Sequence, residues 1–217
     1  MAVADRKAEG DRQSHDFLVA ALAMARPDDA VLSEEGKDDP IRLTSDRVWI
    51  VDPLDGTREF GEGDREDWAV HVALWEKGSL VAGAVALPAQ GVTFRSDQPP
   101  AVPALGSPLR LVVSRSRPPA LVTELAQVLG AELVPMGSAG AKAMSLLQGT
   151  SDAYVHGGGQ YEWDSAAPVV VAAAAGLHTS RLDGSPLLYN QEDVLLPDLV
   201  VCQPSVAQQL LEAIAEL

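Results

Sequence analysis

The fold of this chain is decided by one stretch, Val48-Trp49-Ile50-Val51-Asp52-Pro53-Leu54-Asp55-Gly56-Thr57. Its first four residues are apolar and predict a short buried strand. We expect the strand to end at Asp52-Pro53, because proline fixes its own backbone angle and has no N–H for a strand ladder. Asp52 and Asp55 then lie three residues apart on a tight corner, which can aim both carboxylates at one point.

This corner offers the ligands that a hard divalent cation prefers. The two carboxylates and the carbonyl of Leu54 are oxygen donors. Gly56 lets backbone N–H groups approach a phosphate, and Thr57 adds a hydroxyl. The alternative is an acidic surface turn, since Asp-Pro-x-Asp-Gly is also typical of turns. The buried strand before it favours a ligand site, because α/β proteins bind ligands at the carboxyl ends of strands.

Two further acidic positions can complete a cation site. Glu34-Glu35 follows a short apolar run, and Asp164 stands at the start of an apolar helix. Taken alone, the glutamates are typical of a solvated pair and Asp164 of a helix N-cap.

Around the corner the chain alternates between helical and extended patterns. Residues 1–10 are polar, and a helix is expected from Asp11, capped by Asp11 or Ser14 and followed by Pro27. We expect strands over 68–76, 79–87 and 92–95, with Lys77-Gly78 as a hairpin connection.

A stretch rich in Pro, Ala and Gly, 97–108, predicts a boundary between two parts, 1–103 and 104–217. Beyond it strands alternate with helices, which indicates an α/β layered fold. The strands are expected over 109–113, 132–135, 153–156 and 199–202, and the helices over 120–129, 139–148, 163–175 and 206–217.

The charge of the chain excludes two classes of partner. Its formal net charge is −15, and so acidic a surface repels nucleic acid and anionic membranes. The single cysteine, Cys202, excludes a disulfide within the chain and lies in an apolar run, so we expect a buried thiol. We see no secretory leader and no apolar run long enough to cross a bilayer, and therefore expect a soluble cytoplasmic protein.

Together, the acidic elements resemble a known family. Asp52-Pro53-Leu54-Asp55-Gly56-Thr57, preceded by Glu34-Glu35 and followed by Trp163-Asp164, is similar to the motifs of the inositol monophosphatase superfamily. These are metal-dependent, lithium-sensitive phosphatases with a five-layer α/β/α/β/α sandwich. The resemblance runs from about Asp11 to the C-terminus. Since the family carries a long helix or two before that segment, it implies a shortened N-terminal helix and leaves a homodimer possible.

Two shorter matches point to one branch of the family. Arg58-Glu59-Phe60 and Val113-Ser114-Arg115-Ser116 resemble segments of the branch that acts on 3′-phosphoadenosine 5′-phosphate. Each alone is typical of a loop with one charge; together they favour this branch.

The resemblance implies a role for each matching residue. Thr57 would orient the attacking water with Asp11 as its acidic partner, although the family's Thr-x-x-Asp reads Ala8-Glu9-Gly10-Asp11 here. Two or three Mg²⁺ ions would bind Glu34, Asp52, the Leu54 carbonyl, Asp55 and Asp164, with Glu35 in support. Substrate contacts would come from Gly56, Thr57, Arg58, Ser114, Arg115, Gly137 and Ser138.

The implied reaction is removal of the 3′-phosphate to give AMP, by in-line attack of metal-activated water, in sulfate assimilation. A bisphosphate needs a second cationic contact, for which Arg58, Arg115 and Arg117 are candidates. Alternative substrates are inositol-1-phosphate, fructose-1,6-bisphosphate and histidinol phosphate. Two alternatives of another class are a non-catalytic divalent-metal-binding module and an inactive, truncated paralogue.

Overall fold

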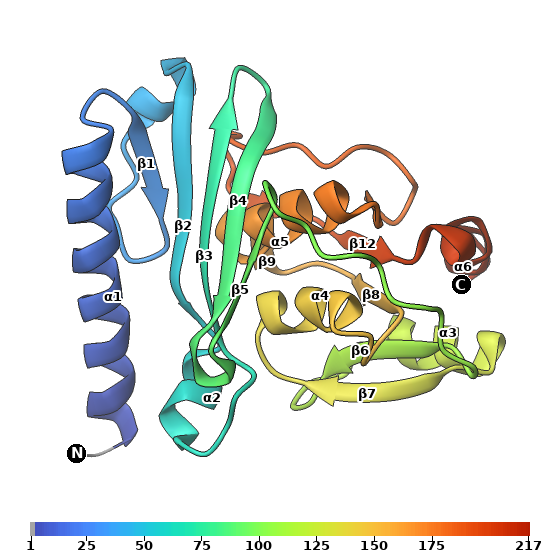
Figure 1. Ribbon diagram of the computed structural model, residues 1–217. Coiled ribbons are helices and arrows are strands. Elements are labelled where there is room, and N and C mark those ends of the chain that lie inside the picture. Colours follow the sequence, from blue (N-terminus) through green and yellow to red (C-terminus); the bar gives the residue numbers. More distant parts are fainter. Residues whose placement is uncertain (1–2) are drawn as a thin grey trace.

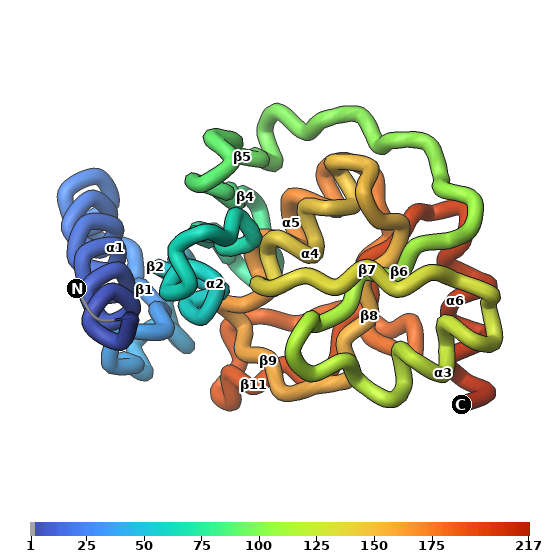
Figure 2. Tube along the Cα trace, turned by 90° about the horizontal axis from the view of Figure 1, so that it is seen from below, coloured from blue at the N-terminus to red at the C-terminus, as the bar shows by residue number. Residues whose placement is uncertain are grey.

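Helices and sheets alternate in five layers across the molecule, as the resemblance implied (Figure 1). The computed structural model describes residues 3–217. Figure 2 shows the first and last helices at opposite ends of the molecule. The helical layers are α1 (Val3–Ala25), then α4 (Ala139–Leu147) with α5 (Glu162–Ala175), then α3 (Ala120–Leu129) with α6 (Ala207–Ala215).

The first sheet lies between α1 and the central helices and has the strand order β1-β2-β3-β4-β5. It is antiparallel except for β1, which runs parallel to β2. Lys77 and Gly78 form the predicted hairpin connection, and both have the positive φ that such a two-residue turn requires. The strands are β1 (Ala30–Ser33), β2 (Arg47–Asp55), β3 (Ala69–Glu76), β4 (Ser79–Leu87) and β5 (Val92–Arg95).

The second sheet has the order β10-β12-β8-β6-β7. Cys202 in its β12 is buried, as expected. The strands are β6 (Arg110–Ser114), β7 (Glu132–Met136), β8 (Ala153–His156), β10 (His178–Ser180) and β12 (Leu199–Cys202). A small sheet pairs β9 (Gln160–Tyr161) with β11 (Leu195–Leu196), and the remaining elements are α2 (Thr57–Glu62) and the 3₁₀ helices Pro40–Thr44, Pro88–Gln90 and Pro204–Val206.

The N-terminal helix begins earlier than predicted. α1 starts at Val3 and is 23 residues long, so Asp11 and Ser14 lie inside it and do not cap its start. Its early turns carry polar pairs such as Arg12 with Glu9, at 2.7 Å. Such pairs stabilise a helix without the apolar periodicity on which the prediction relied.

The two sheets lie on either side of the predicted boundary, since β5 ends at Arg95 and β6 begins at Arg110. Helix α5 nevertheless packs against β2, β3 and β4. The division into 1–103 and 104–217 as separate units stays a prediction. Among the described residues, no helix has both the length and the apolar character that crossing a bilayer demands.

Gly83 marks a close approach between the first sheet and α5. A Cβ added there would collide with Cγ1 of Val170. We expect Gly83→Val to lower the free energy of unfolding in urea by about 2 kcal/mol, the usual cost of overpacking. Ala82→Val, on the opposite face of the same strand, is the matched control and should change stability less. Equal losses in the two variants would contradict this packing.

Candidate metal centre

A bulge in β2 places the two aspartates of the motif side by side. The strand was predicted to end at Asp52-Pro53, but it continues through the proline to Asp55. Its pairing with β3 shifts between them, because Asp52 pairs with His71 whereas Asp55 pairs with Ala69. A bulge bends a strand and re-aims its side chains. The predicted corner therefore lies within the sheet instead of beyond its end.

Asp164 completes a cluster of three carboxylates. One oxygen from each of Asp52, Asp55 and Asp164 lies within 4.8 Å of the other two. Asp164 extends from the first turn of α5, where its Oδ2 accepts a hydrogen bond of 2.6 Å from the Tyr161 N–H. Asp164 is thus the third residue of the helix and bonds back to the N-cap residue, Tyr161, instead of being the N-cap itself. This bond is compatible with the predicted metal role, because a carboxylate has two oxygens.

Glu34 approaches this cluster from the end of β1, a strand that the sequence analysis did not predict. β1 runs parallel to β2, and the Glu34 N–H donates to the Val51 carbonyl at 3.2 Å. Although Glu34 is partly exposed, desolvation and the charge of Asp164 raise its pKa to about 7. Glu35 is instead close enough to Asp11 for its charge to raise the pKa of that residue.

The crowding of negative charge shows in the other pKa values. Asp52 is buried, and burial together with the charges of Asp55 and Glu34 raises its pKa well above the usual range. Burial and the charge of Asp55 raise the pKa of Asp164 to about 6. A cluster of oxygen donors that repel one another in this way fits a hard cation such as Mg²⁺, which would remove the repulsion.

Asp55 is held through one of its two oxygens. Its Oδ2 accepts hydrogen bonds from Ser138 Oγ at 2.5 Å and from the Gly140 N–H at 2.6 Å. Burial raises the pKa of Asp55, but the adjacent His71 imidazole and the hydrogen bonds from Ser138 and Gly140 outweigh burial and lower it to about 2. Asp55 is therefore ionised and has its other oxygen available to a cation.

The predicted pair of Thr57 and Asp11 lies next to the motif. The Thr57 hydroxyl donates to the Leu54 carbonyl at 3.1 Å and lies close enough to the Asp11 carboxyl, which projects from α1, to lower the pKa of that residue. A single hydroxyl proton serves only one of these acceptors at a time. Burial raises the pKa of Asp11 to about 6, against the effect of the nearby Thr57 hydroxyl.

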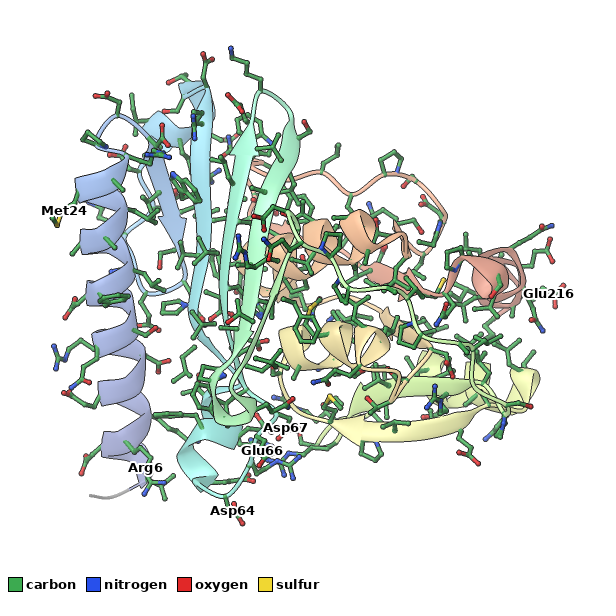
Figure 3. The ribbon with its side chains drawn as sticks, viewed as in Figure 1. Arg6, Met24, Asp64, Glu66, Asp67 and Glu216 are labelled. Carbon is green, nitrogen blue, oxygen red and sulfur yellow. The ribbon has the colours of Figure 1, made fainter. Side chains whose placement is uncertain are left out.

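Three predicted substrate contacts already have partners within the protein. Arg115 donates to Glu59 at 2.7 Å and to Glu62. The Gly137 N–H donates to Asp67, in the acidic loop after α2 that Figure 3 shows with Asp64 and Glu66. Ser138, besides holding Asp55, caps α4. Their roles in substrate binding stay predictions.

Of the other four, Thr57 is described above, and the remaining three have fewer partners. Gly56 has a φ of 86° at the start of α2, a conformation that favours glycine. Arg58 is exposed on α2. Ser114 ends β6 at the wall of a cleft of about 420 Å³. Their roles likewise stay predictions.

This cleft contains a lysine that the sequence analysis missed. Lys142 is buried in α4, with its ammonium 5.2 Å from the centre of the Tyr154 ring. Burial lowers its pKa, whereas the nearby charges of Asp55 and Asp164 raise it. A single lysine within an apolar helix is the signal that could have found it. The cleft is lined by Ser114, Arg117, Pro119, Lys142, Tyr154, Val155, His156, Gly158 and Gly159.

The inositol monophosphatase family model matches residues 4–217. The chain belongs to this family. A 3′-phosphoadenosine 5′-phosphate phosphatase of Mycobacterium tuberculosis (strain CDC 1551 / Oshkosh) is 55% identical, over 95% of this chain and 81% of the relative. The 3′(2′),5′-bisphosphate nucleotidase CysQ of Escherichia coli (strain K12) is 33% identical, over 86% of this chain and 80% of the relative.

Solved structures of the family share the fold. CysQ from Bacteroides thetaiotaomicron has a TM-score of 0.73 and 30% identity, over 89% of this chain and 83% of that chain. Staphylococcal inositol monophosphatase-1 has a TM-score of 0.79 and covers 94% of this chain and 79% of that chain. Its identity is 19%, so this likeness concerns the fold alone. The family and the layered fold predicted from the motifs are thereby confirmed.

The raised carboxyl pKa values predict how stability depends on pH without metal. Between about pH 4 and pH 7 the folded protein keeps protons on Glu34 and Asp164 that the unfolded chain releases, so stability falls as pH rises through this range. In chelator, we expect the melting temperature to be lower at about pH 8 than at about pH 5.5. Added Mg²⁺ should raise it more at the higher pH, where protons no longer compete. Equal shifts at both pH values would contradict a cation site here.

Proposed function

We propose that this protein is a Mg²⁺-dependent phosphatase that removes the 3′-phosphate of 3′-phosphoadenosine 5′-phosphate and releases AMP. The observation that carries the proposal is the cluster of Asp52, Asp55 and Asp164 near a cleft with Lys142 and Arg117. Relatives that are 55% and 33% identical are named for this substrate and for nucleoside bisphosphates. The proposal includes inhibition by lithium and a cytoplasmic role in clearing the by-product of sulfate transfer.

The metal ions would be held by Glu34, Asp52, Asp55, Asp164 and the Leu54 carbonyl. Bound there, Mg²⁺ would supply charge that neutralises the phosphate and would make the attacking water more acidic. The hydroxyl of Thr57, between the Leu54 carbonyl and Asp11, orients the water for in-line attack on phosphorus. Asp11, with a pKa of about 6, is ionised at neutral pH and can accept a hydrogen bond from the Thr57 hydroxyl or from the water. The water oxygen would bond to phosphorus and release a proton to solvent, while the bond from phosphorus to the 3′ oxygen breaks and that oxygen takes up a proton from solvent.

A bisphosphate also requires a cation that faces its second phosphate. Arg115 is poorly suited, because its guanidinium already pairs with Glu59 and Glu62. Arg117 is exposed and lines the same cleft as Lys142, so both cations can face one anion there. We therefore assign the second phosphate to Arg117 and Lys142, of which only Arg117 was a candidate from the sequence.

The metal ligands can be tested by removing one charge at a time. Asp52→Asn and Asp55→Asn should each lower kcat/KM at least about 100-fold, because each removes a carboxylate that would hold the cation. Asp64→Asn, in the exposed loop labelled in Figure 3, is the matched control and should retain activity. Phosphate release in Mg²⁺ buffer, with circular dichroism as a check of folding, measures both. Activity near that of the wild type in either ligand variant would exclude this metal centre.

Substrate choice tests the cleft separately. We expect 3′-phosphoadenosine 5′-phosphate to be preferred over 3′-AMP, inositol-1-phosphate and fructose-1,6-bisphosphate. Arg117→Ala should raise KM for the bisphosphate about tenfold while changing KM for 3′-AMP less, since a charged hydrogen bond contributes about 1.5–3 kcal/mol. Arg115→Ala in the same assay should affect both substrates alike. If Arg115→Ala instead weakened binding of only the bisphosphate, the result would support Arg115, a candidate from the sequence, as the contact for the second phosphate. Hydrolysis of none of these substrates by the wild type would favour a metal-binding module.

A further inference from the structure

His71 is a buried side chain that connects two of the elements bearing the carboxylates. It lies in β3 and is fully buried. Its Nδ1 is 3.1 Å from the Trp163 carbonyl in the first turn of α5. Its Nε2 is 3.3 Å from Oδ2 of Asp55 in β2, a charge contact, and forms no hydrogen bond with the described residues.

The partners of His71 define what its ring does. A carbonyl only accepts hydrogen bonds, so Nδ1 carries a proton and donates a hydrogen bond to the Trp163 carbonyl, while Nε2 faces the Asp55 carboxylate at charge-contact distance. On the Asp55 side, His71 joins Ser138 and Gly140 on the same oxygen, Oδ2. Two hydrogen bonds and the charge contact with the imidazole on this one oxygen restrain the carboxylate and leave Oδ1 for a cation.

The other ring nitrogen of His71, Nδ1, forms a hydrogen bond with the start of α5. Trp163 directly precedes Asp164, so a bond to the Trp163 carbonyl restrains the turn from which Asp164 projects. Space for the ring depends on Gly140, because a Cβ at that position would collide with His71 Nε2. The ring is thus confined between β2, α4 and α5.

We propose that His71 is a positioning residue of the metal centre, which holds Asp55 and the Asp164-bearing turn in the relative placement that a cation requires. This inference rests on the proposed function, because it needs Asp55 and Asp164 to be metal ligands. It assigns His71 no contact with substrate or cation.

Metal affinity without substrate tests this role. Titration calorimetry with Mn²⁺ should show binding about 10–100-fold weaker for His71→Leu than for the wild type, the usual effect of losing a partner that orients a ligand. His71→Gln keeps an N–H that can face Asp55 and should recover most of the affinity. His178→Gln, whose histidine contacts Ser180 of its own strand, is the matched control and should bind normally.

The outcomes separate this inference from the proposed function. No Mn²⁺ binding by the wild type would overturn both. Binding by the wild type with unchanged affinity in His71→Leu, or with equal losses in the leucine and glutamine variants, would overturn only the positioning role. If His71→Leu does not fold in chelator, Gly140→Ala replaces it, since the added methyl displaces the ring but keeps the imidazole. Weaker Mn²⁺ binding in that variant supports the proposal, and unchanged binding overturns it.

Discussion

Repulsion between carboxylates in one poorly solvated place is the constraint on which the rest of this structure depends. At the 4.8 Å limit of the cluster, two ionised carboxylates repel by about 3 kcal/mol at an effective dielectric constant of 20. The raised pKa values of Asp52, Asp164 and Glu34 follow from this repulsion and from burial. Protons relieve it at low pH, and at neutral pH divalent cations are suited to do so.

The fold creates this repulsion by bringing carboxylates from separate elements to one place. Asp52 and Asp55 come from a bulge in β2, Glu34 from the end of the parallel strand β1, and Asp164 from the first turn of α5. The start of α4 anchors Asp55 through Ser138. Because α4 and α5 lie between the sheets, both halves of the chain contribute to one centre (Figure 1).

Local charge in one cleft differs in sign from the net charge of the chain. The chain as a whole carries −15, yet Lys142 and Arg117 line one cleft. Arg115 instead joins the end of β6 to α2 through Glu59 and Glu62. The sequence offered Arg58 and Arg115, with Arg117 as a further candidate, and the ion pairs of Arg115 set that residue apart from the other two.

The sequence by itself determined the family, the layered fold and the carboxylates that cluster together, because short motifs such as 52–57 and local patterns such as the Lys77-Gly78 hairpin depend on neighbouring residues. Only the tertiary structure decided the bulge in β2, the strand β1 and the contacts of His71 and Lys142. These depend on partners distant along the chain, as with His71 and Trp163, 92 residues apart. Neither periodicity nor turn propensity records which distant segments pack together, since that is set by burial and pairing over the whole fold.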